Sequence, residues 1–224
     1  MKPAGPTRKI EMFTGIVSGT APIVKIEEKD FIRTFTVDLD KYDDNLEIGA
    51  SVALDGVCMT VVSIENNLVK FDAIEETLSR TTLGKLSVDS SVNIERSLKM
   101  GDELGGHIIS GHVLMSAKII QIKDRGEGID ILVENPSDAR HYILEKGYIS
   151  IDGMSLTIGN VSKDSFALHI IPETLRVTTI GGKKVGDYVN IEIDSRTQAV
   201  VDTIRKSMEA VSYTHLTLPT ILLV

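Results

Sequence analysis

Short apolar stretches, rich in Val, Ile and Thr and divided by Gly, Asp and Asn, fill the chain from residue 12 onward. Stretches of about five such residues, bounded by turn-forming residues, are typical of β-strands. Six of them occur in the first half of the chain, at 13–26, 34–39, 51–56, 58–64, 68–73 and 91–96. Six short strands in so short a segment predict a small antiparallel β-barrel.

The same pattern returns in the second half. The stretch SVALDGVCMTVVSI at 51–64 aligns with YISIDGMSLTIGNV at 148–161, so that Asp152 falls on Asp55 at an offset of 97 residues. This offset also places IIPETLRVTTIG on AIEETLSRTTLG and YVNIE on SVNIE. Three blocks that keep one spacing indicate a tandem duplication of a whole domain, because solenoid and propeller repeats have periods of only about 20–50 residues. We therefore expect two similar barrels and two similar ligand sites.

The opening of the second copy, GGHIISGHV, matches that of the first at an offset of 96, with Gly111 on Gly15. A short linker at 97–106, with three glycines, precedes it. The duplication thus predicts one barrel at 12–106 and a second at 107–196. The segments at 1–11 and 212–224 show no related pattern, and we interpret them as an extension and a tail unrelated to the fold.

Helices are expected at three places. Two short ones, at 39–49 and 135–147, would each end at a glycine. A longer one at 197–211 is amphipathic and has no counterpart after the first repeat; its apolar face carries Val201, Ile204, Met208 and Val211. This terminal helix has two possible arrangements: it caps its own barrel, or it bundles with copies of itself.

Composition and charge narrow the class of protein. The 224 residues are 42% hydrophobic and 25% charged, and no apolar run approaches the ~20 residues of a membrane span. The net charge of −8 argues against a nucleic-acid surface, since phosphate binding requires a basic face. One cysteine cannot form an internal disulfide, and no signal peptide is visible, so we expect a cytoplasmic protein without a membrane partner.

Small hydrogen-bonding side chains recur at paired positions. Ser155 and Thr157 match Cys58 and Thr60, and alternation places both members of each pair on one face of a strand. An isolated pair is more often part of a solvated strand face. Repetition in both halves favours one kind of ligand bound twice. No phosphate loop or dinucleotide fingerprint is present, and His107 and His112 would lie on opposite sides of a strand, so no metal site is expected.

Several blocks together carry a family resemblance: MFTGIV, GVCMTVV, GGHIISGH, IDGMSLTIG, IPETLRVTTIG and NIEID, in that order from residue 12 to about 211. The chain resembles the riboflavin synthases of the alpha-chain type, which are built from tandem lumazine-binding barrels. One departure is Val57, since relatives often have Gly-Cys-Cys where this chain has Gly56, Val57 and Cys58.

The resemblance implies a mainly β fold of two antiparallel barrels with a C-terminal helix, and an enzyme that needs no cofactor. Such enzymes transfer a four-carbon unit between two molecules of 6,7-dimethyl-8-ribityllumazine, giving riboflavin and 5-amino-6-ribitylamino-pyrimidinedione. It also implies a homotrimer, in which the first barrel of one subunit faces the second barrel of its neighbour, and a possible association with lumazine synthase.

Carried over by position, the first pocket would comprise Gly15, Ile16, Val17, Cys58, Met59, Thr60, Asp72, Ala73, Ile74, Glu75, Glu76 and Thr77. The second would comprise Gly111, His112, Val113, Lys146, Ser155, Leu156, Thr157, His169, Ile170, Ile171, Pro172, Glu173 and Thr174. Asp194 would accept hydrogen bonds from ribityl hydroxyls.

The resemblance also suggests catalytic roles. His112 is the candidate for proton transfer, because an imidazole titrates near neutrality. Cys58, or a water that it positions, is the candidate nucleophile, and Ser51 is a further candidate at the same pocket. The charged groups gather in the second half and the thiol lies in the first, so we expect one pocket to bind tightly and the other to activate the substrate.

Two rival functions remain. A non-catalytic lumazine or flavin antenna protein would have the same fold but would need only one good pocket. A flavin reductase barrel would need a nicotinamide-binding domain, and the sequence has no fingerprint of one.

Overall fold

The computed structural model describes residues 12–216, with side chains described through residue 209. The first half contains β1 (Gly19–Lys29), β2 (Ile32–Asp38), β3 (Ser51–Leu54), β4 (Val57–Glu65), β5 (Leu68–Ile74) and β6 (Ser91–Arg96). The second half contains β7 (Met115–Asp124), β8 (Ile129–Glu134), β9 (Tyr148–Ile151), β10 (Met154–Val161), β11 (Ser165–Ile170) and β12 (Tyr188–Ile193). The α-helices are α1 (Glu75–Arg80), α2 (Pro172–Val177) and α3 (Ser195–Leu216).

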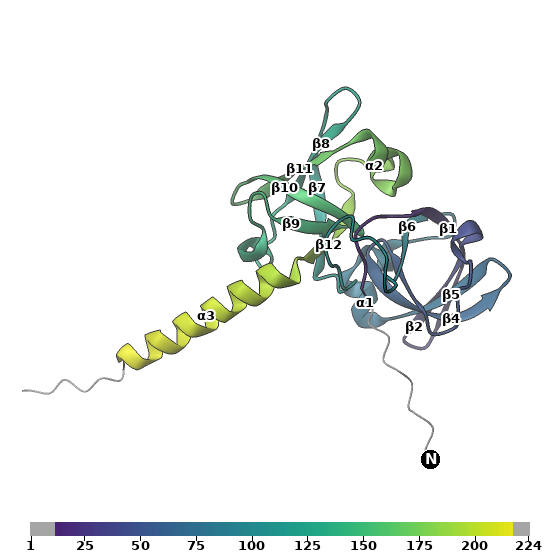
Figure 1. Cartoon of the computed structure of the whole chain (residues 1–224), viewed down its shortest axis with the longest axis horizontal. Helices are drawn as coiled ribbons and strands as arrows, with labels where there is room; N and C mark the ends of the chain where they lie inside the picture. The colour runs from purple at the N-terminus through teal and green to yellow at the C-terminus, as the bar shows by residue number, and fades with distance from the viewer. Residues whose placement is uncertain (1–11, 217–224) are drawn as a thin grey trace, which may run out of the picture.

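The strands form two closed barrels. The first closes in the order β1-β2-β5-β4-β3-β6, and the second in the order β10-β11-β8-β7-β12-β9, which is the same cycle once β7 is matched to β1. The two barrels lie side by side, and α3 extends away from the second one (Figure 1). The predicted mainly β fold, with an internal duplication and a terminal helix, is confirmed.

Each barrel has its own apolar core because side chains alternate along the strands. On β5, Val69, Phe71 and Ala73 point inward, which leaves Asp72 on the outer face. On β11 the inward positions are Phe166, Leu168 and Ile170, and His169 is outside. The outer faces of these two strands are therefore available for binding.

The short helices predicted at 39–49 and 135–147 are wrong. Single 3-10 turns, Asp40–Tyr42 and Arg140–Tyr142, are found instead. The backbone is left-handed at Asp40 (φ 40°) and Lys146 (φ 65°), which no α-helix permits. Burial of Leu39 and Ile143 in the barrel cores holds these segments in their irregular path. The short helices α1 and α2, which follow β5 and β11, were not anticipated as helices.

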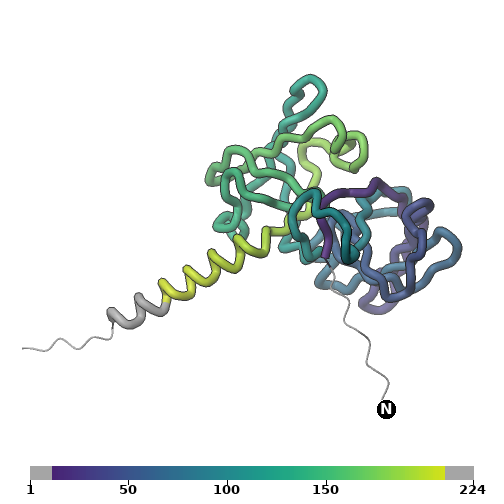
Figure 2. The backbone as a smooth tube through the Cα atoms, viewed as in Figure 1, coloured from purple at the N-terminus to yellow at the C-terminus, as the bar shows by residue number. Residues whose placement is uncertain are grey.

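The first apolar run, predicted as one strand at 13–26, is divided. The strand β1 begins only at Gly19, and the residues before it form an opening segment outside that strand. Figure 2 shows this opening segment, in purple, beside the teal connection between the barrels. There Phe13 and Ile109 exchange backbone hydrogen bonds of 2.7 and 3.0 Å.

The terminal helix α3 begins at Ser195, two residues before the predicted start at 197. Asp194 caps α3, since its carboxylate accepts hydrogen bonds from the N–H (2.9 Å) and the hydroxyl (2.8 Å) of Thr197. About two turns later, the hydroxyl of Tyr142 donates to Asp202 (2.5 Å) and ties α3 to its own barrel. Further along, Ile204 and Met208 are 53% and 68% exposed, so this part of the helix does not cap the barrel.

Two remaining expectations concern the ends of the chain and the membrane. Residues 1–11 and 217–224, which fall in the predicted extension and tail, lie outside the described residues, whereas α3 continues to Leu216. Within the described part of the chain, no helix is both long and apolar enough to cross a bilayer.

Candidate functional site

The opening segment of each half lies on the barrel of the other half. The N–H of Ser155, on β10, donates to the carbonyl of Gly15 (2.9 Å). Symmetrically, the N–H of Cys58, on β4, donates to the carbonyl of Gly111 (3.0 Å). The sequence-based prediction grouped residues 15–17 with Cys58 and residues 111–113 with Ser155. Within one chain the structure shows the opposite pairing: residues 15–17 lie against Ser155, and residues 111–113 lie against Cys58.

Glycine is required at the two positions where an opening segment approaches the other barrel, Gly15 and Gly111. Gly15 and Gly111 each have φ of +78°, which side chains with a Cβ rarely adopt. A Cβ at Gly15 would lie 2.5 Å from the Cβ of Ser155, and one at Gly111 would lie 2.4 Å from the Cβ of Cys58. The close approach of each segment to its strand thus explains the repeated glycine.

Two buried glutamates hold these segments. The carboxylate of Glu95 accepts hydrogen bonds from the N–H (2.6 Å) and hydroxyl (2.8 Å) of Thr14 and from the N–H of Gly15 (3.0 Å). Glu192 binds Ser110 and Gly111 in the same manner, at 2.7, 2.7 and 2.9 Å. Burial raises the pKa of both carboxyls, and these hydrogen bonds oppose the rise. Sequence reasoning missed both residues, although each lies in a repeated NIE block.

A cavity of about 250 Å³ opens on the outer face of the second barrel. Its walls come from the segment before β9, from β10 and β11, and from the start of α2. The sequence-predicted residues that line it are Lys146, Ser155, Leu156, Thr157, His169, Ile171 and Thr174, and Ile158 and Gly159 complete the lining.

One edge of this site is formed by a histidine that was considered only as a metal ligand. His107 shares a hydrogen bond with the hydroxyl of Ser155 (2.6 Å), and its ring stacks on Tyr148 with centroids 5.2 Å apart. Burial lowers the pKa of His107, and the carboxylate of Asp194 opposes that shift. The pKa of Asp194 is itself low: burial raises it, but hydrogen bonds from Thr197 more than offset this. Asp194 is therefore a helix cap as well as a predicted ribityl ligand.

The corresponding face of the first barrel carries the predicted catalytic groups. Cys58 is half-buried, and His112, exposed, directly follows the Gly111 carbonyl that binds the Cys58 N–H. His112 and Cys58 thus border one strand of the same chain. On the outer face of β5, Asp72 accepts a hydrogen bond from the hydroxyl of Thr34 (2.6 Å).

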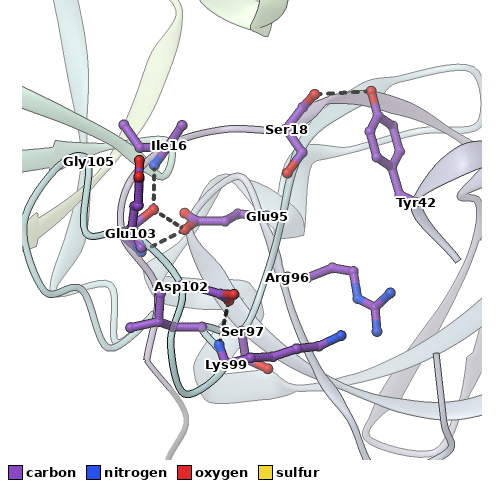
Figure 3. Close-up of a pocket in the computed structure, with 12 residues that line it drawn as sticks. Ile16, Ser18, Tyr42, Glu95, Arg96, Ser97, Lys99, Asp102, Glu103 and Gly105 are labelled. Carbon is purple, nitrogen blue, oxygen red and sulfur yellow. Dashed lines mark hydrogen bonds between the residues drawn. The ribbon is translucent and has the colours of Figure 1, made fainter. Parts of the chain in front are cut away.

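The third candidate, Ser51, lies next to this face. It is buried and pairs in register with Thr60 across β3 and β4. It lines a hollow of about 690 Å³, whose walls also include Arg96 at the end of β6 and the linker residues 97–102. Figure 3 shows the adjoining hollow of about 500 Å³, in which Glu95 points toward the opening segment and Asp102 accepts from the N–H of Lys99 (2.7 Å).

Comparison with known proteins accounts for the duplication. The lumazine binding domain family matches the chain twice, at residues 14–97 and 110–194. Riboflavin synthase of Escherichia coli (strain K12) is 50% identical over 202 residues, which cover 89% of this chain and 94% of that protein. The chain belongs to the riboflavin synthase family. A second riboflavin synthase, from Buchnera aphidicola subsp. Schizaphis graminum, is 49% identical over 198 residues, 87% of this chain and 95% of the relative.

Solved structures share this architecture. The crystal structure of LumP complexed with 6,7-dimethyl-8-(1'-D-ribityl) lumazine is 26% identical with a TM-score of 0.74, and covers 82% of this chain and 99% of LumP. The complex of LumP with riboflavin is 28% identical with a TM-score of 0.75, and covers 82% and 100%. Membership of the riboflavin synthase family makes the chain an enzyme of the transferase class. The assignment of individual residues to ligand binding or catalysis stays a prediction.

Proposed function

We propose that this member of the riboflavin synthase family converts two molecules of 6,7-dimethyl-8-ribityllumazine into riboflavin and 5-amino-6-ribitylamino-pyrimidinedione. The observation that supports it most is the pair of equivalent outer faces, one on each barrel, each completed by the opening segment of the other half. Two copies of one substrate require two related sites. The binding of lumazine and riboflavin by LumP supports the same ligands here.

The two faces suit a flat ring that carries a polar chain. Ile74 and Ile171 occupy equivalent positions and are 55% and 61% exposed, so each face offers apolar surface for a ring system. Beside each isoleucine are hydroxyl and backbone groups, such as Thr77 and Thr174, that can bind ring edges and ribityl hydroxyls. We propose that each face binds one lumazine.

The reaction is self-contained. The two products together hold every atom of two substrate molecules, so no oxidant, reductant or other co-reactant is needed. A proton must leave the methyl group on C7 of one lumazine, and a nucleophile must add to C7 of the other. We assign proton transfer to His112 and the nucleophile, or the positioning of a water, to Cys58 or Ser51. Stacking the two bound rings in register contributes most of the rate enhancement, because it removes the entropic cost of bringing the two substrates together.

The two faces belong to different barrels, and we propose that they meet between subunits. The exposed stripe of Val200, Ile204 and Met208 on α3 would be covered in a homotrimer. We place the reaction in the cytoplasm, where the single cysteine, Cys58, stays reduced. Association with lumazine synthase stays a prediction.

Incubation of the purified protein with 6,7-dimethyl-8-ribityllumazine tests the proposal. Riboflavin absorbance should rise, and chromatography should show one riboflavin and one pyrimidinedione for each two lumazines consumed. Lumazine that binds, as judged by a change in its fluorescence, without any riboflavin forming would assign the antenna function instead.

A further inference from the structure

The outer wall of the second site contains a hydrogen-bonded pair that the first site lacks. His169 on β11 lies directly opposite Asp130 on β8 in the strand register. Its Nδ1 is 2.6 Å from Oδ1 of Asp130, and Nε of Arg125 donates to Oδ2 of the same carboxylate (2.5 Å). Both oxygens of Asp130 are thus engaged. The hydrogen bonds from His169 and Arg125 hold the pKa of Asp130 below its usual value, so this group is a carboxylate at neutral pH.

This contact determines where the imidazole proton lies. A carboxylate only accepts hydrogen bonds, so Nδ1 of His169 must carry the hydrogen, and Nε2 of the neutral ring keeps a free lone pair. Nε2 lies close to Gly159, since a Cβ at that position would be 2.9 Å from it. His169 and Gly159 both line the 250 Å³ cavity. The geometry therefore presents a hydrogen-bond acceptor at the cavity wall.

The first barrel is built differently at the equivalent positions. Asp72 stands where the second barrel has His169, and its partner across the strands is the Thr34 hydroxyl. Val62 stands where the second barrel has Gly159, at the offset of 97. A side chain there would collide with an imidazole ring. Compared with the first site, the second site thus has no side chain at position 159 and has His169 paired with Asp130. These features together make one local difference between otherwise equivalent sites.

We propose that Asp130 is a positioning residue: it holds His169 in the tautomer with hydrogen on Nδ1, so that Nε2 accepts a hydrogen bond from a ring N–H or ribityl hydroxyl of the ligand in the second site. This inference rests on the proposed function and deepens it, because it gives one of two related sites its own recognition group. A reaction in which identical substrates play different roles needs such a difference.

Two measurements on the full-length protein test the assignment. Histidine ¹⁵N chemical shifts should show His169 protonated on Nδ1 at pH 8, and Asp130→Asn should shift it toward the other tautomer. In a fluorescence titration with riboflavin, Asp130→Asn should weaken one of two sites about 5- to 10-fold, the worth of one hydrogen bond. Arg125→Gln, which removes only the outer partner of Asp130, is the matched control and should leave the tautomer unchanged.

A double variant separates positioning from a structural role. If Asp130 acts through His169, Asp130→Asn should weaken riboflavin binding no further in a His169→Ala background. An Nε2–H tautomer in the parent protein, or equal losses with and without His169, would overturn the proposal. If the parent protein binds neither riboflavin nor the lumazine, the proposed function fails, and the tautomer measurement still decides the role of Asp130.

Discussion

Asn93 and Asn190 bind the two barrels together by a reciprocal contact. The side-chain amide of Asn93 donates to the carbonyl of Asp152 in the second barrel (2.8 Å), and that of Asn190 donates to the carbonyl of Asp55 in the first (2.8 Å). Each asparagine is fully buried. The contact therefore fixes the relative position of the two proposed ligand faces, and we expect its loss to reduce the stability of the fold more than the chemistry of the reaction.

Replacement of Asn190 by alanine should destabilise the protein by about 2–5 kcal/mol. The Asn190 side chain also accepts from the N–H of Thr82 (2.7 Å) and donates to its hydroxyl (2.9 Å), so the variant leaves buried polar groups of Asp55 and Thr82 unpaired. Urea unfolding measures the effect. Asn160→Ala, at an exposed position on β10, is the control and should change the unfolding free energy by less than about 0.5 kcal/mol.

A side chain at Gly56 should separate the barrels. A Cβ there would lie 2.5 Å from the backbone nitrogen of Gly153, which cannot move aside. Gly186 is the matched control: it has a similarly left-handed backbone (φ 99°) with nothing within 4 Å of a Cβ. Gly186→Ala should lower the free energy of unfolding by only the conformational penalty, about 1–2 kcal/mol, whereas Gly56→Ala should lower it by clearly more. Equal losses in thermal unfolding would show that the close approach is unimportant.

The buried carboxyl of Asp55 should make stability depend on pH. Burial, with the nearby carboxyl of Asp152, raises the pKa of Asp55 to about 8. Between about pH 4, where an unfolded aspartate titrates, and pH 8, the folded protein holds a proton that the unfolded chain releases, so the stability due to Asp55 falls as pH rises. Lys183, paired with Asp152 at 3.2 Å, stays charged throughout this window because the carboxylates keep its pKa high despite its burial.

Asp55→Asn tests this dependence. Asparagine tolerates the left-handed backbone at this position (φ 46°) and can still accept from the N–H of Asn93. The variant should lose less unfolding free energy than the parent between pH 5 and pH 8, as measured by urea titration at several pH values. Asp89→Asn, an exposed aspartate with φ of 70°, should leave the pH profile unchanged. Parallel profiles for parent and Asp55→Asn would contradict the prediction.

Removal of the chain from Gln198 onward should abolish both the proposed trimer and the activity. The apolar side chains of α3 would lose their partners, while the barrels keep their own cores. Light scattering should give the mass of one chain instead of three. Ile204→Lys should act in the same direction, whereas Glu209→Lys, away from the stripe, should not. A truncated protein that stays trimeric would contradict the assignment.

The two catalytic candidates should behave differently. His112→Gln should leave KM nearly unchanged and reduce kcat by about 10²–10⁴-fold, the usual contribution of one proton-transfer group. Cys58→Ser should reduce kcat only in part, because a hydroxyl can still position a water. A His112→Gln variant with the parent kcat and KM would make His112 a structural residue.

The repeat predicts much of this molecule, but not which parts touch. Equal spacing shows that Gly15 and Gly111 are equivalent, and this led to the assumption that each lies on its own barrel. The exchange depends on hydrogen bonds from Ser155 and Cys58, which only the packed barrels reveal. Likewise, Asp130 lies outside every repeated block, so its contact with His169 depends on strand register that the sequence does not show. The core positions were predictable because alternation alone decides them.

The pairing of Phe13 with Ile109 has an evolutionary consequence. The two residues hold equivalent positions in the two repeats. Their contact is therefore of the isologous kind, in which the same surface patch pairs with its equivalent, as in a twofold dimer of single barrels. In such a dimer, every substitution would appear on both sides of the axis. Fusion of the two copies into one gene removes that constraint, and a change such as Leu86 to Lys183, equivalent at the offset of 97, can then occur on one side alone. Covalent linkage of two equivalent barrels therefore allows the two halves of one chain to specialise.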